Sequence, residues 1–210
     1  KGKKATLIFD GAMSHARVYV NGKEAGYWPY GYNSFHLDVT PYLKAGEINE
    51  LAVRLENENE SSRWYPGAGL YRNVHLVVTE DAYVPTWGTH VTTPVVKDQF
   101  AKVHVETQWN MPKGKKISDY TIATEILNPE GKKVNADTRS GDELDETLFA
   151  QDFVVRNPSL WSVEYPHLYT AVSKIYEGDR LVDEYTTRFG IRTLEIIPEK
   201  GFFLNGKLTK

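Results

Sequence analysis

Cysteine is absent from this chain of 210 residues. Without thiols, the chain cannot form disulfides, thiolate zinc sites or a cysteine nucleophile. No apolar run approaches the roughly 20 residues that a membrane helix needs, so we expect no membrane partner. An excess of positive charge is also missing, since the formal net charge is -3. We therefore do not expect nucleic acid or an anionic membrane as a partner.

Short motifs that set a catalytic or metal-binding geometry are also lacking. The six histidines are scattered, without a pair at ligand spacing, so we expect no metal site. There is no glycine-rich phosphate loop, and we expect no cofactor. Glycoside hydrolysis usually needs two carboxylates that face each other across the bond. The chain has 28 Asp and Glu residues, but none lies in a short motif that sets this geometry.

Two further polar patterns favour structure over chemistry. Ser14 and His15 are adjacent in sequence only, and this is not evidence of a catalytic triad. Glu56, Glu58 and Glu60 alternate in or beside a polar loop, and we interpret them as a solvated face. The sequence therefore assigns no catalytic residue in this chain.

Alternating apolar residues in the first 80 positions predict short antiparallel strands. Ala16–Val20 runs into Asn21-Gly22, which is a strong two-residue hairpin signal. No stretch has a sustained helical period, and strands at this spacing indicate a sandwich or jelly roll. The strands are predicted over Ala5–Asp10, Ala16–Val20, Glu24–Trp28, Phe35–Thr40, Leu51–Leu55 and Asn73–Thr79, with Val74, Leu76 and Val78 on one face.

A second block of strands follows a linker at Asp81–Pro85. Seven short strands separated by turn signals are typical of an immunoglobulin-like sandwich, although the Cys…Trp…Cys pattern of antibody domains is absent. The strands are predicted over Thr86–Thr93, Ala101–Trp109, Asp119–Leu127, Lys132–Ala136, Glu146–Val155, Leu168–Tyr176 and Arg180–Phe189.

The last residues differ from both blocks. Leu194–Ile197 is predicted to be a strand, and Gly201–Lys207 is predicted to be a small hairpin with Asn205-Gly206 at its turn. The chain has no obvious core for this hairpin to join. We therefore interpret residues 194–210 as the start of a third domain.

Two aromatic clusters are candidates for binding. Tyr27–Tyr32 follows the first hairpin, and Arg63-Trp64-Tyr65 follows the polar loop. Each cluster either packs as an edge of the sandwich or contacts a ligand. Arginine beside aromatic rings suits a hydroxyl-rich ligand, because the guanidinium donates to sugar oxygens while a ring covers the apolar face. We expect Arg72 to pair with a carboxylate inside the fold, since Leu70-Tyr71 before it is predicted to be buried.

The motifs together resemble glycoside hydrolase family 2, most closely its bacterial β-galactosidases. The resemblance covers nearly the whole chain and depends on the order and spacing of the motifs. The segments that carry it are Asp10-Gly11, Val18-Tyr19-Val20-Asn21-Gly22, Arg63-Trp64-Tyr65-Pro66-Gly67-Ala68-Gly69-Leu70-Tyr71-Arg72-Asn73-Val74, Pro158-Ser159-Leu160-Trp161-Ser162, Pro166-His167-Leu168-Tyr169, Phe189-Gly190-Ile191-Arg192 and Gly201-Phe202-Phe203-Leu204-Asn205-Gly206-Lys207.

The resemblance implies an all-β fold class. Residues 1–80 would be the C-terminal part of a jelly-roll sugar-binding domain, and residues 82–193 an immunoglobulin-like β-sandwich. Residues 194–210 would lead into a catalytic (β/α)8 barrel that is missing here. The acid/base and nucleophile glutamates of the family lie on that barrel, beyond Lys210. The chain is thus expected to be the non-catalytic N-terminal region of a retaining exo-glycosidase that hydrolyses terminal β-galactosides.

The resemblance also implies a substrate contact. The corresponding loop of β-galactosidases reaches the mouth of the active site, which makes Arg63, Trp64 and Tyr65 the candidate substrate-binding residues. The expected partners are a β-galactoside or related oligosaccharide and the protein's own barrel domain, with a homo-oligomer left open. Location is open between the bacterial cytoplasm and periplasm.

Two alternatives and one physical expectation accompany this interpretation. The chain could instead be a free-standing carbohydrate-binding or adhesion module, or part of a β-glucuronidase or β-mannosidase of the same family. A jelly roll without its first strands leaves sheet edges and apolar faces unpaired. We therefore expect residues 1–80 to be less stable than the second block, or protected by self-association.

Overall fold

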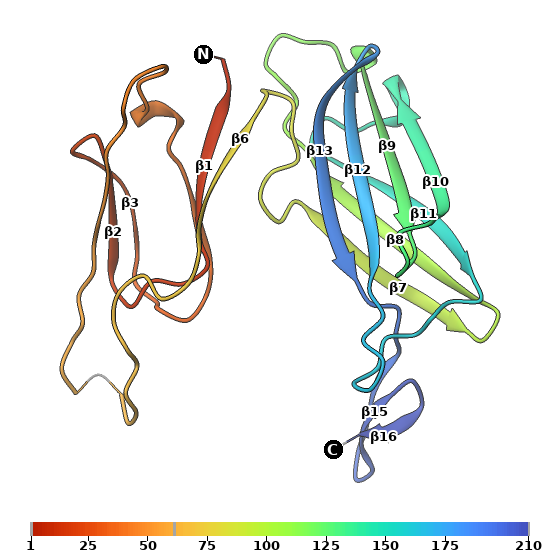
Figure 1. Cartoon of the computed structure of the whole chain (residues 1–210). Coiled ribbons are helices and arrows are strands. Elements are labelled where there is room, and N and C mark those ends of the chain that lie inside the picture. Colours follow the sequence, from red (N-terminus) through yellow and green to blue (C-terminus); the bar gives the residue numbers. More distant parts are fainter. Residues whose placement is uncertain (1, 61, 210) are drawn as a thin grey trace. The chain divides into compact units, whose positions relative to one another are not determined.

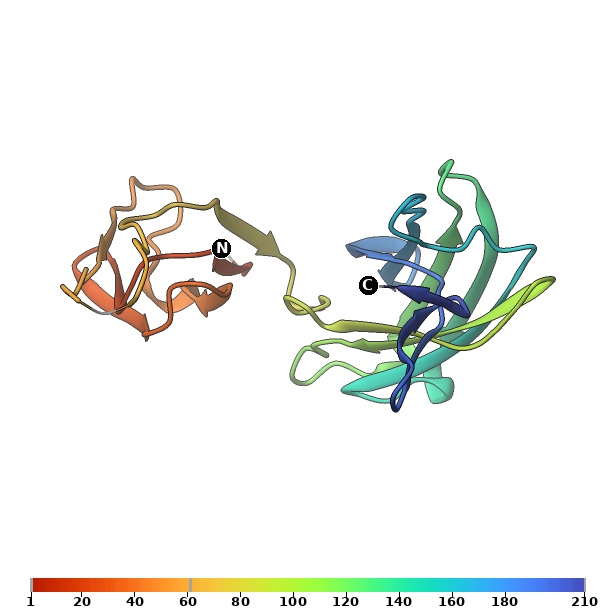
Figure 2. The ribbon, with the colours of Figure 1, turned by 90° about the horizontal axis from the view of Figure 1, so that it is seen from below.

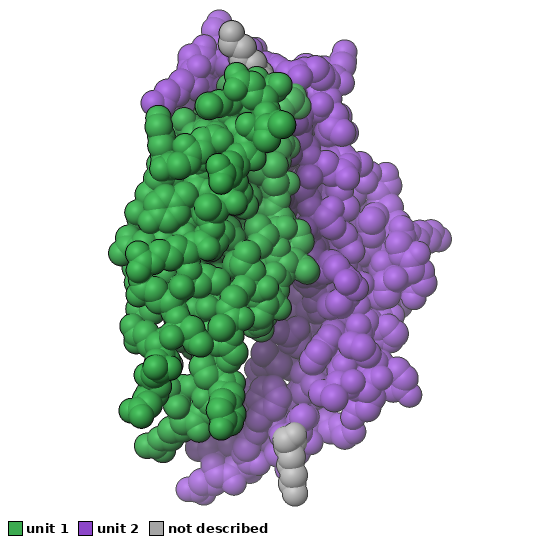
Figure 3. All heavy atoms as spheres, turned by 60° about the vertical axis from the view of Figure 1, so that its left-hand side comes forward, with its two compact units in different colours: residues 1–81 green, residues 82–210 purple. Residues whose placement is uncertain are grey.

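A computed structural model describes residues 2–60 and 62–209 of the chain, and its regular structure is almost entirely β (Figure 1). The chain forms two compact units, residues 1–81 and 82–210, which Figure 3 shows in different colours. Short 3-10 helices occur at Thr40–Tyr42, Ile117–Asp119 and Gly141–Glu143. No helix in residues 2–60 and 62–209 is long and apolar enough to cross a membrane.

The first unit consists of two antiparallel sheets of three strands each (Figure 2). One sheet has the order β4-β1-β6 and the other β3-β2-β5. The strands are β1 (Lys4–Phe9), β2 (Ala16–Val20), β3 (Lys23–Trp28), β4 (Phe35–Asp38), β5 (Leu51–Arg54) and β6 (Val74–Thr79). The six strands predicted from alternation are present, with ends that differ by at most two residues.

The core of this unit follows from the period of two along its strands. Alternate residues of β1 and β2 are buried, because successive side chains of a strand point to opposite faces. Asn21 and Gly22 join β2 to β3 with left-handed φ values of 51° and 75°, which this type of two-residue turn requires. The buried cluster comprises Ala5, Leu7, Phe9, Ala12, Ala16, Val18, Val20, Phe35 and Val39.

The inner face of β6 is open. Leu76 pairs with Leu7 across the sheet, so the two side chains share the face that carries the core. Leu7 is 7% exposed, whereas Leu76 is 57% exposed, and Val74 and Val78 on the same face are also exposed. These three residues share a face as predicted, but nothing in the described chain covers them.

The second unit is a two-sheet sandwich with strand orders β10-β9-β12-β13 and β11-β8-β7. Its inner face comes from alternating buried residues on β8, β9, β11 and β12. Seven antiparallel strands in two sheets are the arrangement of an immunoglobulin-like domain. The strands are β7 (Thr89–Lys97), β8 (Phe100–Gln108), β9 (Tyr120–Leu127), β10 (Lys133–Ser140), β11 (Leu148–Arg156), β12 (Tyr169–Glu177) and β13 (Arg180–Phe189).

Strand β7 differs from its prediction. It was expected to begin at Thr86 and end at Thr93, but it spans Thr89–Lys97. A turn closed by a hydrogen bond from the Gly88 amide to the Pro85 carbonyl delays its start. The strand continues past Pro94 through a register shift, because proline has no amide to donate to the ladder.

The chain ends in a small sheet of order β14-β15-β16, formed by Leu194–Ile197, Gly201–Leu204 and Lys207–Thr209. The Asn205 side-chain amide donates to the Trp161 carbonyl at 3.0 Å, and its oxygen accepts from the Thr193 amide at 3.0 Å. Leu204 is buried. The turn is thus held against the second unit by Asn205 and Leu204. Leu194, Ile196 and Leu208 remain exposed, and none of the core clusters of the described residues includes a residue of 194–209.

Candidate functional site

The loop of residues 57–68 lies between β5 and β6, and one short segment holds both of its ends. At the entry, the Glu56 amide donates to the Ser14 carbonyl at 2.9 Å. At the exit, Met13 and Gly69 exchange two backbone hydrogen bonds of 3.0 and 3.2 Å. Because Met13 and Ser14 are neighbours, the two ends of the loop are held close together and the loop projects from the edge of the unit.

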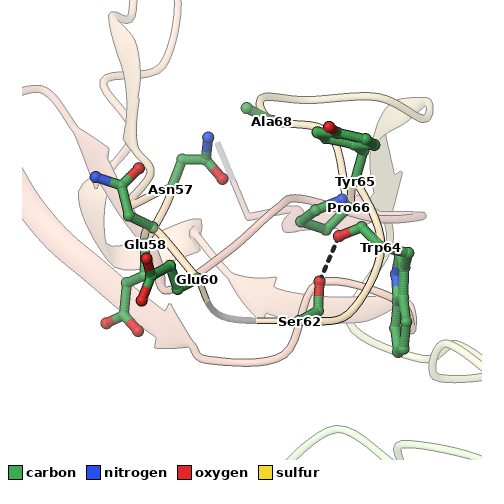
Figure 4. Close-up of a pocket in the computed structure, with 10 residues that line it drawn as sticks. Asn57, Glu58, Glu60, Ser62, Trp64, Tyr65, Pro66 and Ala68 are labelled. Carbon is green, nitrogen blue, oxygen red and sulfur yellow. Dashed lines mark hydrogen bonds between the residues drawn. The ribbon is translucent and has the colours of Figure 1, made fainter.

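The loop encloses an open hollow of about 540 Å³. Figure 4 shows the side chains of Asn57, Glu58 and Glu60 on one limb and those of Trp64 and Tyr65 on the other. The Ser62 hydroxyl donates to the Trp64 carbonyl at 2.8 Å, which shapes the turn between the limbs. The hollow thus has one wall of carboxylates and amides and one aromatic wall. The described residues that line it are Asn57, Glu58, Asn59, Glu60, Ser62, Trp64, Tyr65, Pro66, Gly67 and Ala68.

The three residues predicted to bind substrate lie at the tip of this loop. Trp64 is 61% exposed, Tyr65 is fully exposed, and both line the hollow. Arg63 is exposed and makes no hydrogen bond or ion pair to any residue in 2–60 and 62–209, but it does not line the hollow. Large rings and a guanidinium at a loop tip are available to a ligand. Their role in binding stays a prediction.

The structure brings together two clusters that the sequence keeps apart. The Trp64 indole N–H donates to the Tyr32 hydroxyl at 2.7 Å, although the residues are 32 positions apart. Tyr30 lies next to Tyr32, with ring centroids 5.6 Å apart. Trp28 from the same segment packs on Phe35 at 5.6 Å. The Tyr27–Tyr32 segment therefore divides into a packed part and an exposed part.

The carboxylate wall is connected to the segment beside it. The two ring nitrogens of His15 contact different groups: Nδ1 lies 2.7 Å from the Tyr27 hydroxyl and Nε2 lies 3.8 Å from a Glu58 oxygen. The Ser14 hydroxyl donates to the Glu56 carbonyl at 2.9 Å and not to His15. Ser14 and His15 thus support the loop and do not form a nucleophile–base pair.

Two predictions about the end of the aromatic run are wrong. Leu70 and Tyr71 are 46% and 44% exposed, not buried. Arg72 pairs with no carboxylate of residues 2–60 and 62–209: its guanidinium donates to the Asp10 carbonyl at 3.4 Å and lies 5.2 Å from the centroid of the Tyr71 ring. An apolar residue type therefore did not imply burial at these two positions.

The groups whose pKa is shifted all belong to the second unit, and some of them are in ion pairs. Hydrogen bonds from Lys115 and then Arg180 lower the pKa of Glu177 to about 2. The Asp152 carboxylate, 2.8 Å from Nδ1 of His104, raises the pKa of that imidazole. These groups lie on sheet surfaces and not in the hollow. Within residues 2–60 and 62–209, no group of three or more His, Asp and Glu side chains is placed to hold a metal ion.

Comparison with known proteins gives the same division of the chain into two regions. The family model described as glycosyl hydrolases family 2, sugar binding domain, matches residues 1–80. The model described as glycosyl hydrolases family 2 matches residues 82–192. These matches and the strand arrangement confirm the all-β fold class, a jelly-roll sugar-binding region followed by an immunoglobulin-like sandwich.

Relatives with different names resemble the chain over its full length. Beta-galactosidase BoGH2A from Bacteroides ovatus is 42% identical over 213 residues, covering 100% of this chain and 25% of that protein. A beta-glucuronidase from Formosa agariphila is 30% identical, covering 100% of this chain and 24% of that protein. A crystal structure of a family 2 member from Bacteroides cellulosilyticus superposes with a TM-score of 0.89 at 36% identity, covering 100% of this chain and 27% of that one. The chain thus spans about a quarter of the length of these relatives.

Proposed function

The chain belongs to family 2 of the glycosyl hydrolases, and from this we propose that it serves a retaining exo-glycosidase acting on terminal β-galactosides. Its first unit supplies a sugar-contacting loop, and its second unit is the immunoglobulin-like domain. The glutamates that break the glycosidic bond lie on a barrel outside this chain. The chain by itself does not turn over substrate.

The observation that supports a sugar contact is the hollow at residues 57–68. Sugars combine an apolar C–H face with a rim of hydroxyls, and they are recognised by aromatic rings together with hydrogen-bonding groups. Trp64 and Tyr65 offer the rings, and Asn57 and Glu58 offer acceptors on the opposite wall. Arg63 adds donors at the loop tip.

A galactoside, in preference to a glucuronide, is supported by two facts. Of the relatives named above, the β-galactosidase has the higher identity. The hollow is lined by the carboxylates of Glu58 and Glu60, and no Lys or Arg is found among its described lining residues. Such a surface repels the carboxylate of a uronic acid and accepts hydrogen bonds from neutral hydroxyls.

The proposal is tested by kinetics on the protein with its barrel and on this chain alone. We expect the longer protein to hydrolyse a chromogenic β-galactoside with a higher kcat/KM than the matching β-glucuronide, and the chain alone to be inactive. Trp64→Ala in the longer protein should raise KM, whereas Trp87→Ala, an exposed tryptophan of the second unit, should leave it unchanged. Turnover by the isolated chain, or a preference for the glucuronide, would refute the proposal.

A free-standing binding module is the second candidate, because every described residue that lines the hollow belongs to the first unit. Calorimetric titration with β-galactosides distinguishes the two. Micromolar affinity of the isolated chain favours the module. Affinity in the millimolar range or weaker favours the glycosidase, since most of its sugar contacts then come from the barrel.

A further inference from the structure

Tyr30, Tyr32 and Trp64 form a continuous surface of rings, the aromatic row. The ring centroids of Tyr30 and Tyr32 are 5.6 Å apart, and those of Tyr32 and Trp64 are 6.5 Å apart. Tyr30 is 56% exposed and Tyr32 is 38% exposed, so the row is accessible along its length. Trp64 also lines the hollow of residues 57–68, so the row begins where the hollow ends.

Hydrogen bonds hold the row in place from both sides. The bond from the Trp64 indole to the Tyr32 hydroxyl joins the two loops. The Tyr71 hydroxyl donates to the Gly31 carbonyl at 2.7 Å and fixes the backbone between Tyr30 and Tyr32. Gly31 is buried, and a Cβ there would overlap the sulfur of Met13. Rings held in this way lose little conformational entropy when a ligand binds.

Packing inside the unit does not explain these rings. Tyr27 of the same segment is 41% exposed but has neighbours within the unit: its hydroxyl contacts His15, and the Arg17 guanidinium lies 4.8 Å from its ring centroid. Tyr30 is 56% exposed, and among residues 2–60 and 62–209 the aromatic ring beside it is that of Tyr32. Exposed aromatic surface held in a fixed position marks a surface that a ligand covers.

We infer that the aromatic row binds a further unit of a neutral, hydroxyl-rich oligosaccharide whose end occupies the hollow. This inference rests on the proposed function and extends it from a terminal sugar to a chain of sugars. The C–H face of a hexose covers the rings of Tyr30 and Tyr32. The Tyr32 hydroxyl accepts from Trp64 and keeps its own hydrogen for a sugar oxygen. Glu58 and Glu60 in the adjoining hollow disfavour a uronic-acid chain.

The test uses the isolated chain and the indole N–H signals of its five tryptophans in a ¹H–¹⁵N NMR spectrum. Trp64→Phe identifies the Trp64 signal. Addition of a neutral β-linked galactotetraose should move this signal with a millimolar dissociation constant, and galactose should bind more weakly. A galacturonic-acid tetramer of equal length should bind at least about tenfold more weakly than the neutral tetramer, a factor that corresponds to about 1.4 kcal/mol.

Variants separate the aromatic row from the hollow. Tyr30→Ala should weaken tetraose binding about five- to tenfold, the loss expected for one ring contact, without changing galactose binding. Tyr32→Phe should shift the free Trp64 signal, because the hydrogen bond is lost, and should also weaken tetraose binding. Tyr165→Ala, which removes an exposed tyrosine of the second unit, is the matched control and should have no effect.

The inference is overturned if the tetraose moves no indole signal, if Tyr30→Ala behaves like Tyr165→Ala, or if the neutral and acidic tetramers bind equally. These outcomes are independent of turnover by the longer protein. If the longer protein hydrolyses β-galactosides but Tyr30→Ala has no effect on tetraose binding, the proposed function stands and the inference about the aromatic row is wrong. If the chain binds the tetraose through the aromatic row but the longer protein cleaves no galactoside, only the proposed function is wrong.

Discussion

Leu7 and Leu76 face each other across β1 and β6, yet replacing them by alanine should have different effects on stability. They are directly paired in the register of the sheet and point to the same inner face. Leu7 lies in the buried cluster, whereas most of Leu76 remains in solvent. The two substitutions remove the same atoms from the same sheet, so the difference in stability measures only how well each is covered.

The exposed fractions of Leu7 and Leu76 determine how much stability each substitution should cost. A buried leucine replaced by alanine costs about 2–5 kcal/mol, because the lost transfer free energy adds to the cost of a cavity. For Leu76, less than half of the side chain is removed from water and no closed cavity forms, so Leu76→Ala should cost about 1 kcal/mol or less. We therefore expect Leu7→Ala to destabilise the first unit by at least about 1 kcal/mol more than Leu76→Ala does.

Amide hydrogen exchange followed by mass spectrometry measures this difference in each unit separately. Peptides from β1 and β2 report the opening free energy of the first unit, and peptides from β8 and β12 that of the second. Both substitutions should leave the second unit unchanged, and the first unit should exchange faster than the second even in the unsubstituted chain. Sedimentation reports the association state of each variant. Equal losses of opening free energy from Leu7→Ala and Leu76→Ala would refute the reasoning. They would mean that the inner face of β6 is covered in solution.

Three further predictions concern the second unit. Asp152 raises the pKa of His104 above its unfolded value. The pair therefore stabilises the folded state below about pH 6.5, and this stabilisation is lost as the pH rises through the folded pKa. Urea unfolding at about pH 5.5 and about pH 8.5 should show this loss, and His104→Gln should remove it. Gly190→Ala should cost roughly 1–3 kcal/mol, because its Cβ would lie 2.8 Å from the Cβ of Trp161; an unchanged unfolding midpoint would contradict this. Asn205→Ala should speed amide exchange in β14–β16 at least about fivefold, since it removes two hydrogen bonds that dock the turn; unchanged exchange would show that the turn is held by other contacts.

Strand positions could be predicted from the sequence where turn residues lie close to the strand ends. β2, β13 and β14 have the predicted bounds, because turn residues lie close to their ends: Asn21-Gly22 after β2, Gly178-Asp179 before β13 and Pro198 after β14. β7 was misplaced at both ends, since its start depends on a turn in the linker and its continuation past Pro94 depends on pairing with β8. Local β-propensity reports neither the position of a turn in the linker nor the pairing with a neighbouring strand.

The candidate site was predicted only in part. The composition of Arg63-Trp64-Tyr65 indicates a binding loop, but it does not indicate which residues lie beside that loop. Trp64 donates to Tyr32 from a loop whose two ends are hydrogen-bonded to Met13 and Ser14. No periodic pattern links residues 32 positions apart in two irregular segments, so this pairing could not be predicted.

The amino-acid sequence was sufficient for the fold class, the family and most strand positions, because each of these depends on local alternation, turn residues and ordered motifs. The exceptions are β7 and the end of β10, which was predicted at Ala136 and lies at Ser140. Whether an apolar residue is covered depends on surfaces that meet only after folding. Leu70, Tyr71 and Leu76 are apolar in sequence, and only the tertiary arrangement showed that they remain in solvent. The same arrangement turned two separate aromatic clusters into one surface, because burial and long-range contact are properties of the packed chain.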